Sequence, residues 1–306
     1  MKDIIIIGGG LAGLTAGMYA KRAGLDTLLF EKMFTGGQAA TTDLIDNYPG
    51  LDEPISGPDF AMKIENHARK FGLEIQYEEI ISLELNDRVK KVITEDKEYE
   101  AKAVILAMGA DAKKLGLEKE DHFRGRGVSY CATCDGAFYK DKDVAVIGGG
   151  DTAAEDALFL AKLVNKVYLI HRRDTLRAAK IIADKVIAHE KIEKVWDSTV
   201  EAILGEEKLV GIRVNNVKTG EKRDIKVDGA FVAIGVRPHS ELVKDKVSMS
   251  EGGYILTDEN MKTDILGIFA AGDIRQKPLL QLVTAAADGA VSAYSAQKYI
   301  IEEFEE

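Results

Sequence analysis

Short apolar runs that end in glycines mark two equivalent places in the chain. Asp3–Gly10 is an aspartate, four isoleucines and three glycines, and Asp143–Gly150 repeats this pattern without a gap, 140 residues later (143 − 3). Such continuous apolar runs are typical of strands buried on both faces of a parallel sheet. Alanine-rich stretches follow and predict helices over Leu11–Ala23 and Asp151–Leu163. The pattern therefore indicates an internal duplication.

The duplication continues beyond each predicted helix. Apolar strands are expected at Thr27–Phe30 in the first copy and Val167–Ile170 in the second, so each copy is a β-α-β unit. A second similarity relates Ala103–Gly109 to Gly229–Gly235. Both are predicted apolar strands that end in glycine, and each lies near the end of its half. A strand ending in glycine lets the backbone pass close to a ligand or cross to another domain.

Other segments complete the predicted architecture. The charged stretches near Glu84–Tyr99 and Ile212–Val227 are interpreted as antiparallel hairpins, an accessory sheet for each half. Gly267–Asp273 is a further buried strand with an acid at its tip, and a long helix is expected over Thr284–Phe304. The fold class is thus α/β, with two Rossmann-like, three-layer dinucleotide-binding domains.

Composition narrows the function. With 306 residues the chain is long enough for two cores, and its formal net charge of −10 argues against a nucleic-acid binder. The run Ile4–Ile7 is far too short for a signal peptide or a membrane span. Two cysteines spaced C-x-x-C are typical of redox or metal chemistry rather than of a secreted scaffold. We expect a cytoplasmic protein that binds neither membrane nor nucleic acid.

The first glycine turn matches the dinucleotide fingerprint. Gly8 permits the tight turn, Gly10 lets a pyrophosphate approach the backbone, and Gly13 permits close packing of helix on strand. Glu31 stands at the end of the next strand, about 20 residues on, where a carboxylate accepts from ribose hydroxyls. A structural glycine-rich turn is the alternative. The acid favours an unphosphorylated adenosine ribose, as in FAD or NAD.

The second turn has the alanine variant of the fingerprint, Gly148-x-Gly150-x-x-Ala153, but a different strand end. His171 stands where the first copy has Glu31, and three arginines follow. These are Arg172, Arg173 and Arg177. Guanidinium groups pair with phosphate in a charge-assisted, often bidentate way. The second site is therefore predicted to prefer the 2′-phosphate of NADPH, with a solvated basic turn as the alternative.

The pair Cys131 and Cys134 is followed at once by Asp135. A redox disulfide is favoured, because thiols at this spacing close a small ring that exchange opens readily. A zinc half-site and a pair of inert buried thiols are the alternatives; the five histidines show no paired ligand spacing. Asp135 would protonate a departing thiolate if burial keeps its carboxyl protonated, and is otherwise a surface turn acid.

Two loops lie just beyond the first β-α-β unit. They are Gly36-Gly37-Gln38 and Asn47-Tyr48-Pro49-Gly50. Both are expected at the carboxyl edge of the sheet, where ligands bind in open α/β folds. Asp273, at the tip of its strand, is a candidate partner for a ribitol hydroxyl.

Taken together, these residues resemble the low-molecular-weight thioredoxin reductases along nearly the whole chain. The most specific passages are Ser129–Gly136, Val146–Ala153 and His171–Arg177, and the loops above and Gly267–Asp273 also match. The larger disulfide reductases carry their cysteines in the FAD domain, whereas here the pair precedes the second glycine turn. The resemblance implies an NADPH-binding domain at 113–240 that carries the cysteines, inserted into a discontinuous FAD-binding domain at 1–112 and 241–306.

Site residues follow position by position from the resemblance. FAD would contact Gly8, Gly10, Gly13, Glu31, Gly37, Gln38, Asn47, Asp273 and Gln281. NADPH would contact Gly148, Gly150, Asp151, Thr152, Arg172, Arg173 and Arg177. Cys134 would face the flavin, Cys131 would attack the substrate disulfide, and Asp135 would be the acid.

The resemblance also implies a homodimer whose substrate partner is thioredoxin or a thioredoxin-like protein. The two domains of each chain would rotate relative to each other, and Ala110–Lys113 and Arg237–Ser240 are the candidate hinges. Met108 and Leu280 depart from the family pattern, the latter where many relatives have arginine. The alternatives are a ferredoxin-dependent or other-partner disulfide reductase on the same scaffold, which the arginines disfavour, and a non-enzymatic flavin redox sensor.

Overall fold

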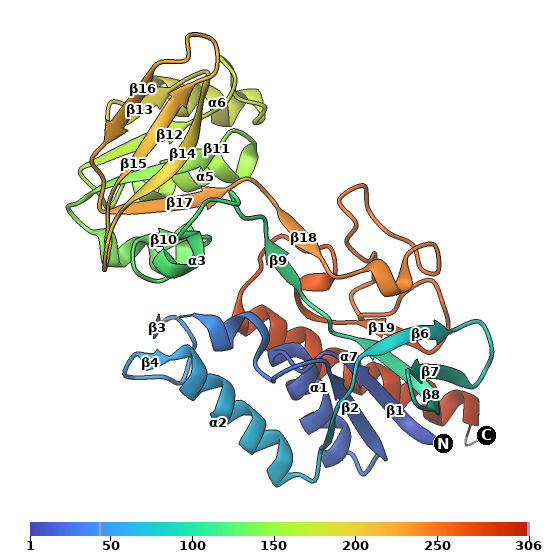
Figure 1. Cartoon of the computed structure of the whole chain (residues 1–306). Coiled ribbons are helices and arrows are strands. Elements are labelled where there is room, and N and C mark those ends of the chain that lie inside the picture. Colours follow the sequence, from blue (N-terminus) through green and yellow to red (C-terminus); the bar gives the residue numbers. More distant parts are fainter. Residues whose placement is uncertain (43, 305–306) are drawn as a thin grey trace. The chain divides into compact units, whose positions relative to one another are not determined.

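The chain forms two compact units, which Figure 1 shows in sequence colours. The structure is a computed structural model that describes residues 1–42 and 44–304. Unit 1 contains Met1–Asp111 and Arg237–Glu306, and unit 2 contains Ala112–Val236. These boundaries lie one and four residues from those expected. The predicted α/β fold class is confirmed, while the nucleotide that each unit binds stays a prediction.

Unit 1 is built on a mixed sheet in the order β5-β2-β1-β8-β7-β6, with β19 also paired to β8. Its strands are β1 (Lys2–Ile7), β2 (Thr27–Glu31), β5 (Glu74–Tyr77), β6 (Ile80–Glu84), β7 (Lys90–Thr94), β8 (Glu98–Leu106) and β19 (Ile268–Ala270). The pairs β1–β2, β1–β8, β2–β5 and β8–β19 are parallel, and β6–β7 and β7–β8 are antiparallel. The expected accessory hairpin is thus continuous with the main sheet through the long strand β8.

The pleat of β1 explains why this run is apolar throughout. Ile4 and Ile6 pack in the core under the helices, and Ile5 and Ile7 pack in a second core on the opposite face. The principal helices of unit 1 are α1 (Leu11–Arg22), α2 (Gly57–Lys70) and α7 (Leu282–Phe304). Its shorter elements are η1 (Gly37–Thr41), β3 (Leu44–Ile45), β4 (Ile55–Ser56), η3 (Glu241–Val243) and η4 (Gly272–Ile274).

Unit 2 has a fully parallel sheet in the order β10-β17-β11-β12-β13 and a separate antiparallel sheet β14-β15-β16. The parallel strands are β10 (Val128–Ser129), β11 (Asp143–Gly148), β12 (Lys166–Ile170), β13 (Ile192–Val195) and β17 (Gly229–Ala233). The antiparallel strands are β14 (Ser198–Gly205), β15 (Leu209–Asn216) and β16 (Lys222–Ile225). The accessory hairpin predicted for the second half is therefore a three-stranded sheet.

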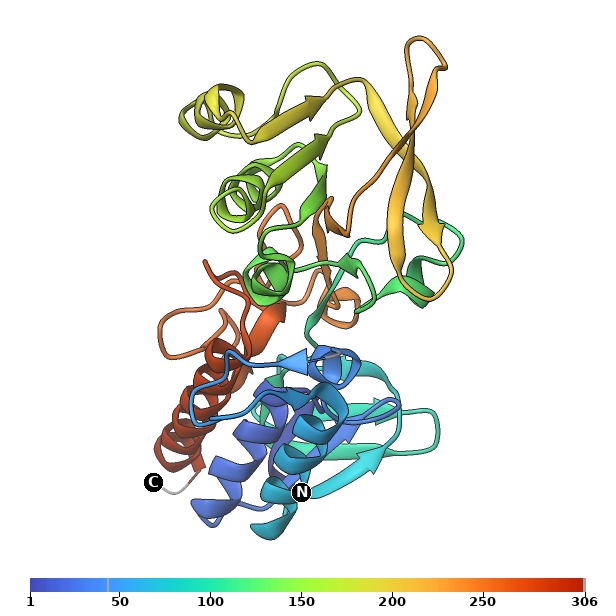
Figure 2. The ribbon, with the colours of Figure 1, turned by 90° about the vertical axis from the view of Figure 1, so that its left-hand side faces the viewer.

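Helices and the antiparallel sheet cover opposite faces of the parallel sheet of unit 2, as the green to gold part of Figure 2 shows. The helices of the first face are α4 (Ala132–Asp135), α5 (Asp151–Leu160) and α6 (Lys180–Ala188), with η2 (Gly136–Tyr139) after α4. The short helix α3 (Glu120–Phe123) lies on the other face, where Phe123 packs with the antiparallel sheet. Val144 and Val146 pack toward α5, and Ala145 and Ile147 pack toward the antiparallel sheet. The helix predicted over Asp151–Leu163 is three residues longer than the observed α5, because the chain turns after Leu160.

The chain passes between the units twice, through β9 (Ala110–Ala112) and β18 (Val236–Pro238). These two short strands pair with each other. The hinge candidates overlap both strands, and their role as a hinge stays a prediction. Among the described helices, none has the length and apolar character that a membrane span requires.

Candidate active site

The glycine turn of unit 1 lies between β1 and α1. Gly8 has φ +106°, and a side chain added to Gly13 would collide with the carbonyl oxygen of Gly8. Gly8 is therefore required by its positive φ and by the nearby backbone of Ala107, and Gly13 by the close approach of helix and turn. The first turn of α1 has neither an acidic residue nor a side-chain cap, so its backbone amides can bind an anion.

Glu31 lies against this turn at the end of β2. Its Oε2 accepts a hydrogen bond from Gly9 N at 2.7 Å, and its Oε1 accepts one from Met33 N at 3.0 Å. The loop containing Gly36 adds a second wall, because Gly36 N donates to Gly9 O at 2.8 Å. Gly10 and Gly37 face each other so closely that a side chain at Gly37 would press on the Gly10 Cα atom. The backbone of Gly8–Gly10 and Gly36–Gly37 thus forms a cradle without side chains, and the Glu31 carboxylate lies at its edge.

Other predicted flavin residues are joined to parts of unit 1 far away in sequence. Asn47 Nδ2 donates to Gln281 Oε1 at 3.1 Å, across 234 residues. The side-chain amide of Gln38 donates to Ala110 O, at the start of β9. The structure thus brings Asn47 and Gln281 together, a contact for which nothing in the sequence is a signal.

Asp273 begins a buried charge network that the sequence did not reveal. Its Oδ1 lies 3.3 Å from Lys277 Nζ, and that ammonium lies 3.1 Å from Asp288 Oδ2. Asp288 also accepts from Gly272 N at 3.1 Å and pairs with Arg275 at 3.3 Å. Burial raises the pKa of Asp273, although the neighbouring Lys277 opposes the shift. Despite the ion pair, Asp273 Oδ1 makes no hydrogen bond within the described residues, so it retains capacity for a ligand hydroxyl.

The glycine turn of unit 2 holds the arginine loop. Arg177 N donates to Gly149 O at 2.7 Å, and Asp151 Oδ1, in the first turn of α5, accepts from Ala179 N at 2.7 Å. A side chain added at Gly150 would meet only open space. Thr152 is exposed in the same helical turn. Asp151 therefore anchors the loop to the helix N-terminus, which is a role the sequence did not suggest.

The arginines of this loop are available to a ligand. Arg172, Arg173 and Arg177 are all exposed. In the part of the chain that the structure describes, no carboxylate lies within ion-pair distance of them. Lys218 neutralises the nearby acids instead, pairing with Asp174 at 3.2 Å and with Asp197 at 3.0 Å. The loop therefore presents uncompensated positive charge beside the glycine turn.

His171 takes the place in unit 2 that Glu31 takes in unit 1. Its ring packs so tightly under Gly149 that any side chain there would collide with it. Burial, with a further contribution from Arg177, lowers the pKa of His171, so the imidazole is neutral at pH 7. Its Nε2 is buried and has no hydrogen-bond partner among the described residues. The site prediction omitted His171, although the duplication aligned it with Glu31.

The cysteines of unit 2 form a disulfide between Cys131 and Cys134, with their Cα atoms 5.3 Å apart. Cys131 immediately precedes the short helix α4, and Cys134 and Asp135 end it. Both cysteines are partly exposed. Among the described residues no cluster of three or more His, Cys, Asp or Glu side chains could hold a metal ion. The pair is thus an accessible disulfide with a carboxylate next to it in sequence.

Partly buried hydrogen bonds hold the chain on both sides of the disulfide. Tyr130 OH donates to Glu120 Oε1 at 2.7 Å, and the buried Glu120 also accepts from three backbone amides of the loop at 115–117. Burial and the Glu120 contact raise the pKa of Tyr130, so its phenol stays protonated. Asp135 Oδ2 accepts from Ser129 Oγ at 2.6 Å.

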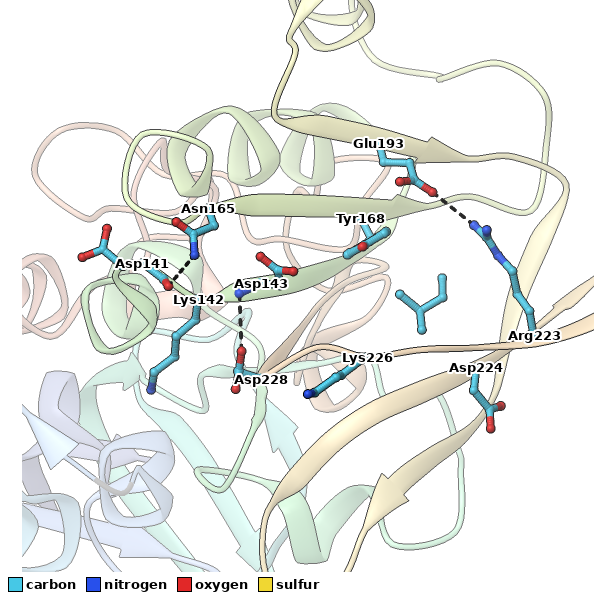
Figure 3. A pocket seen from close by; sticks show the side chains of 11 residues that line it. Asp141, Lys142, Asp143, Asn165, Tyr168, Glu193, Arg223, Asp224, Lys226 and Asp228 are labelled. Carbon is cyan, nitrogen blue, oxygen red and sulfur yellow. Dashed lines mark hydrogen bonds and ion pairs between the residues drawn. The ribbon is translucent and has the colours of Figure 1, made fainter.

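A hollow of about 640 Å³ lies in unit 2 at the start of β11 and β12, the strand ends opposite the glycine turn. Figure 3 shows side chains of both charges around it, with Glu193 and Arg223 paired and Asp228 accepting from Asp143 N. Its walls lack the bare backbone of a nucleotide cradle. We therefore place the candidate active site at the glycine turns and the disulfide.

Known proteins match the chain over almost its full length. The family model for pyridine nucleotide-disulphide oxidoreductases matches residues 2–290. A thioredoxin reductase of Treponema pallidum is 47% identical over 298 residues, covering 97% of both chains. The thioredoxin reductase of Bacillus subtilis is 46% identical and covers 98% of this chain and 95% of its own.

Solved structures agree with these sequence matches. The crystal structure of thioredoxin reductase from Streptococcus pyogenes has a TM-score of 0.95 and 44% identity, with 99% of both chains covered. Thioredoxin reductase from Giardia duodenalis has a TM-score of 0.93 and 37% identity, with 98% of both chains covered.

Proposed function

The chain belongs to the pyridine nucleotide-disulphide oxidoreductase family, and from this premise we propose that it is a thioredoxin reductase. Family membership carries with it the use of a flavin and a nicotinamide nucleotide. In the proposed reaction, electrons pass from NADPH through FAD to the Cys131–Cys134 disulfide and on to the disulfide of thioredoxin. The observation that carries this proposal is an accessible disulfide in the same unit as the arginine-bearing glycine turn.

Unit 1 fits FAD. The bare backbone at Gly10 and Gly37 leaves room for a pyrophosphate, and the amides at the start of α1 supply its hydrogen bonds. Glu31 would accept hydrogen bonds from the adenosine ribose. Asp273 Oδ1, which has no hydrogen-bond partner among the described residues, would accept one from a ribitol hydroxyl. The joined side chains of Asn47 and Gln281 would contact the rest of the flavin.

Unit 2 fits NADPH. Gly148 and Gly150 form the turn, with Thr152 beside it, and Asp151 holds the arginine loop against it. The loop arginines, free of carboxylate partners among the described residues, would pair with the 2′-phosphate. Nε2 of the neutral His171, which has no hydrogen-bond partner among the described residues, would form a hydrogen bond with a ribose hydroxyl. When bound, the two nucleotides supply the hydride and electron transfer that reduces the cysteine pair.

The chain's own residues then perform thiol–disulfide exchange. The Cys131 thiolate attacks one sulfur of the thioredoxin disulfide, and the other thioredoxin sulfur leaves as a thiolate. Asp135 would give that thiolate its proton. The Cys134 thiolate next attacks Cys131 in the mixed disulfide, so the Cys131–Cys134 bond re-forms and the second thioredoxin sulfur leaves and takes a proton. Thioredoxin gains two electrons and two protons.

Further features of the proposal come from the resemblance and the composition. We propose a homodimer and a cytoplasmic location. The other candidate, a flavin redox sensor, shares the same motifs but would not turn over.

A Cys134→Ser variant tests the assignment. It should lose NADPH-dependent reduction of thioredoxin by at least about 10³-fold, because the mixed disulfide is no longer resolved within the enzyme. NADPH oxidation with ferricyanide as acceptor should persist, because this reaction does not need the cysteine pair. Thr133→Ser, an exposed position between the cysteines, is the matched control and should retain turnover. Normal thioredoxin reduction by Cys134→Ser would refute the proposed function.

A further inference from the structure

Ser129 links the two ends of the cysteine segment through one buried hydroxyl. It ends β10 with only 4% of its surface exposed. Its Oγ accepts from Cys131 N at 3.1 Å, donates to Asp135 Oδ2 at 2.6 Å, and also lies 3.3 Å from Cys131 O. The Ser129 hydroxyl thus contacts three atoms: N and O of Cys131, which we propose attacks the substrate, and Oδ2 of Asp135, which we propose supplies a proton.

A hydroxyl has one proton, so Ser129 cannot donate to Asp135 and to Cys131 O at once. When Asp135 is ionised, the Ser129 proton points to Oδ2. When Asp135 is protonated, its own O–H donates to Ser129 Oγ, and the Ser129 proton turns to Cys131 O. In both states Oγ accepts from Cys131 N. These three distances therefore suit both protonation states of the Asp135 carboxyl group.

We propose that Ser129 is a positioning residue that holds Asp135 in one orientation while the carboxyl group releases and regains its proton. This inference rests on the proposed function, in which Asp135 protonates the departing thiolate. In that step the proton moves from the Asp135 carboxyl to the sulfur of the leaving group, the S–S bond breaks, and the Ser129 hydroxyl turns to donate to the new carboxylate. No further reactant is needed.

A purely structural role of Ser129 would also lower activity when the residue is replaced. The test therefore measures the energetic coupling between Ser129 and Asp135. In a double-mutant cycle, Ser129→Ala should lower kcat for thioredoxin reduction about tenfold, as loss of a charge-assisted hydrogen bond implies. In an Asp135→Asn background the same change should have an effect of less than about twofold, because the group that Ser129 serves is gone. Ser129→Thr, which keeps a hydroxyl, should restore most of the rate.

A second readout is independent of turnover and of bound nucleotide. The rate of Cys131 alkylation by iodoacetamide, measured against pH in the dithiol-reduced protein, should show an inflection that Asp135→Asn lacks. Ser129→Ala should move that inflection about one pH unit upward, because the carboxylate loses a donor. Circular dichroism checks that each variant is folded.

Two results would overturn the proposal. One is an equal effect of Ser129→Ala with and without the Asp135 carboxyl, and the other is an alkylation profile that Ser129→Ala leaves unchanged. If instead the wild-type protein fails to reduce thioredoxin with NADPH while the alkylation inflection responds as expected, the proposed function fails and the Ser129–Asp135 coupling stands. If Ser129→Thr does not fold, the cycle with Ser129→Ala decides alone.

Discussion

Glu31 and His171 stand at equivalent positions under the two glycine turns, and we propose that they give the two halves of the duplicated chain different ligand preferences. A carboxylate repels a 2′-phosphate, whereas a neutral imidazole beside three arginines does not. The sequence was sufficient to predict that these two residues occupy equivalent strand ends, because the strand ends align between the copies; the nucleotide preference of each half stays a prediction. It was not sufficient to predict the Ser129–Asp135 bond, since a strand end and a helix end meet there only in the folded unit.

Arg172 provides the test of nucleotide preference. Arg172→Ala should raise the KM for NADPH roughly 10- to 100-fold, because a charge-assisted bond to phosphate is worth about 1.5–3 kcal/mol. The KM for NADH should change little, since NADH lacks the 2′-phosphate. Steady-state kinetics with both nucleotides gives the answer. Lys226→Ala, on the mixed-charge hollow at the opposite strand ends, is the control. An equal loss for both nucleotides would mean that Arg172 does not read the phosphate.

Asp156 on α5 makes stability depend on pH. Burial, with some repulsion from Glu155, raises its pKa from 3.8 to about 6. As pH rises from about 4 to 6, the unfolded chain ionises Asp156 before the folded chain does, so the folded state loses stability. Asp156→Asn should therefore stabilise the protein by about 3 kcal/mol above pH 6 and by less than about 1 kcal/mol at pH 4.

Urea unfolding at pH 4 and pH 7 measures this difference. Glu155→Gln, at the exposed neighbouring position, removes only the smaller repulsive contribution and should therefore stabilise the protein at pH 7 much less than Asp156→Asn does. A gain for Asp156→Asn that is the same at both pH values would show that ionisation is not its cause.

At the scale of elements, the sequence defined strands and helices well where one apolar pattern governed burial. The strands β1 and β11 and the helices α1 and α7 lie within two residues of their expected positions. The helix α5 is shorter than expected, because the pattern of apolar residues continues through the turn after Leu160. The continuity of β8 through both parts of the unit 1 sheet also escaped prediction, since register between distant strands leaves no local signal.

The contact between α1 and α7 offers a test in which two effects differ in sign. In an exposed helix, Gly→Ala stabilises by about 1 kcal/mol. A side chain at Gly289 would instead collide with the carbonyl oxygen of Ala12. Gly289→Ala should therefore destabilise the protein, by about 2 kcal/mol or more, because the helices must separate. Denaturant unfolding reports the sign, and a gain in stability would show that the helices do not pack this closely.

At the scale of the whole molecule, each unit contains one glycine turn at which we propose that a nucleotide binds. Near each turn a buried polar atom, Asp273 Oδ1 or His171 Nε2, has no hydrogen-bond partner among the described residues. The duplicated pattern predicted the two glycine turns from the sequence. It did not predict the network of Asp273, Lys277 and Asp288, because those residues meet only when the C-terminal helix packs back onto unit 1. A dimer remains a prediction, which light scattering of the purified protein tests.

The most direct test of the proposed electron path is to count the thiols that NADPH produces. The flavin-loaded protein is mixed anaerobically with excess NADPH, quenched with an alkylating reagent and examined by mass spectrometry. We predict two added groups, at Cys131 and Cys134. Both should be lost when oxidised thioredoxin is added before the quench in excess over the NADPH, because thioredoxin then takes up all the electrons. Reduction of thioredoxin by NADPH while both cysteines stay disulfide-bonded would contradict the account.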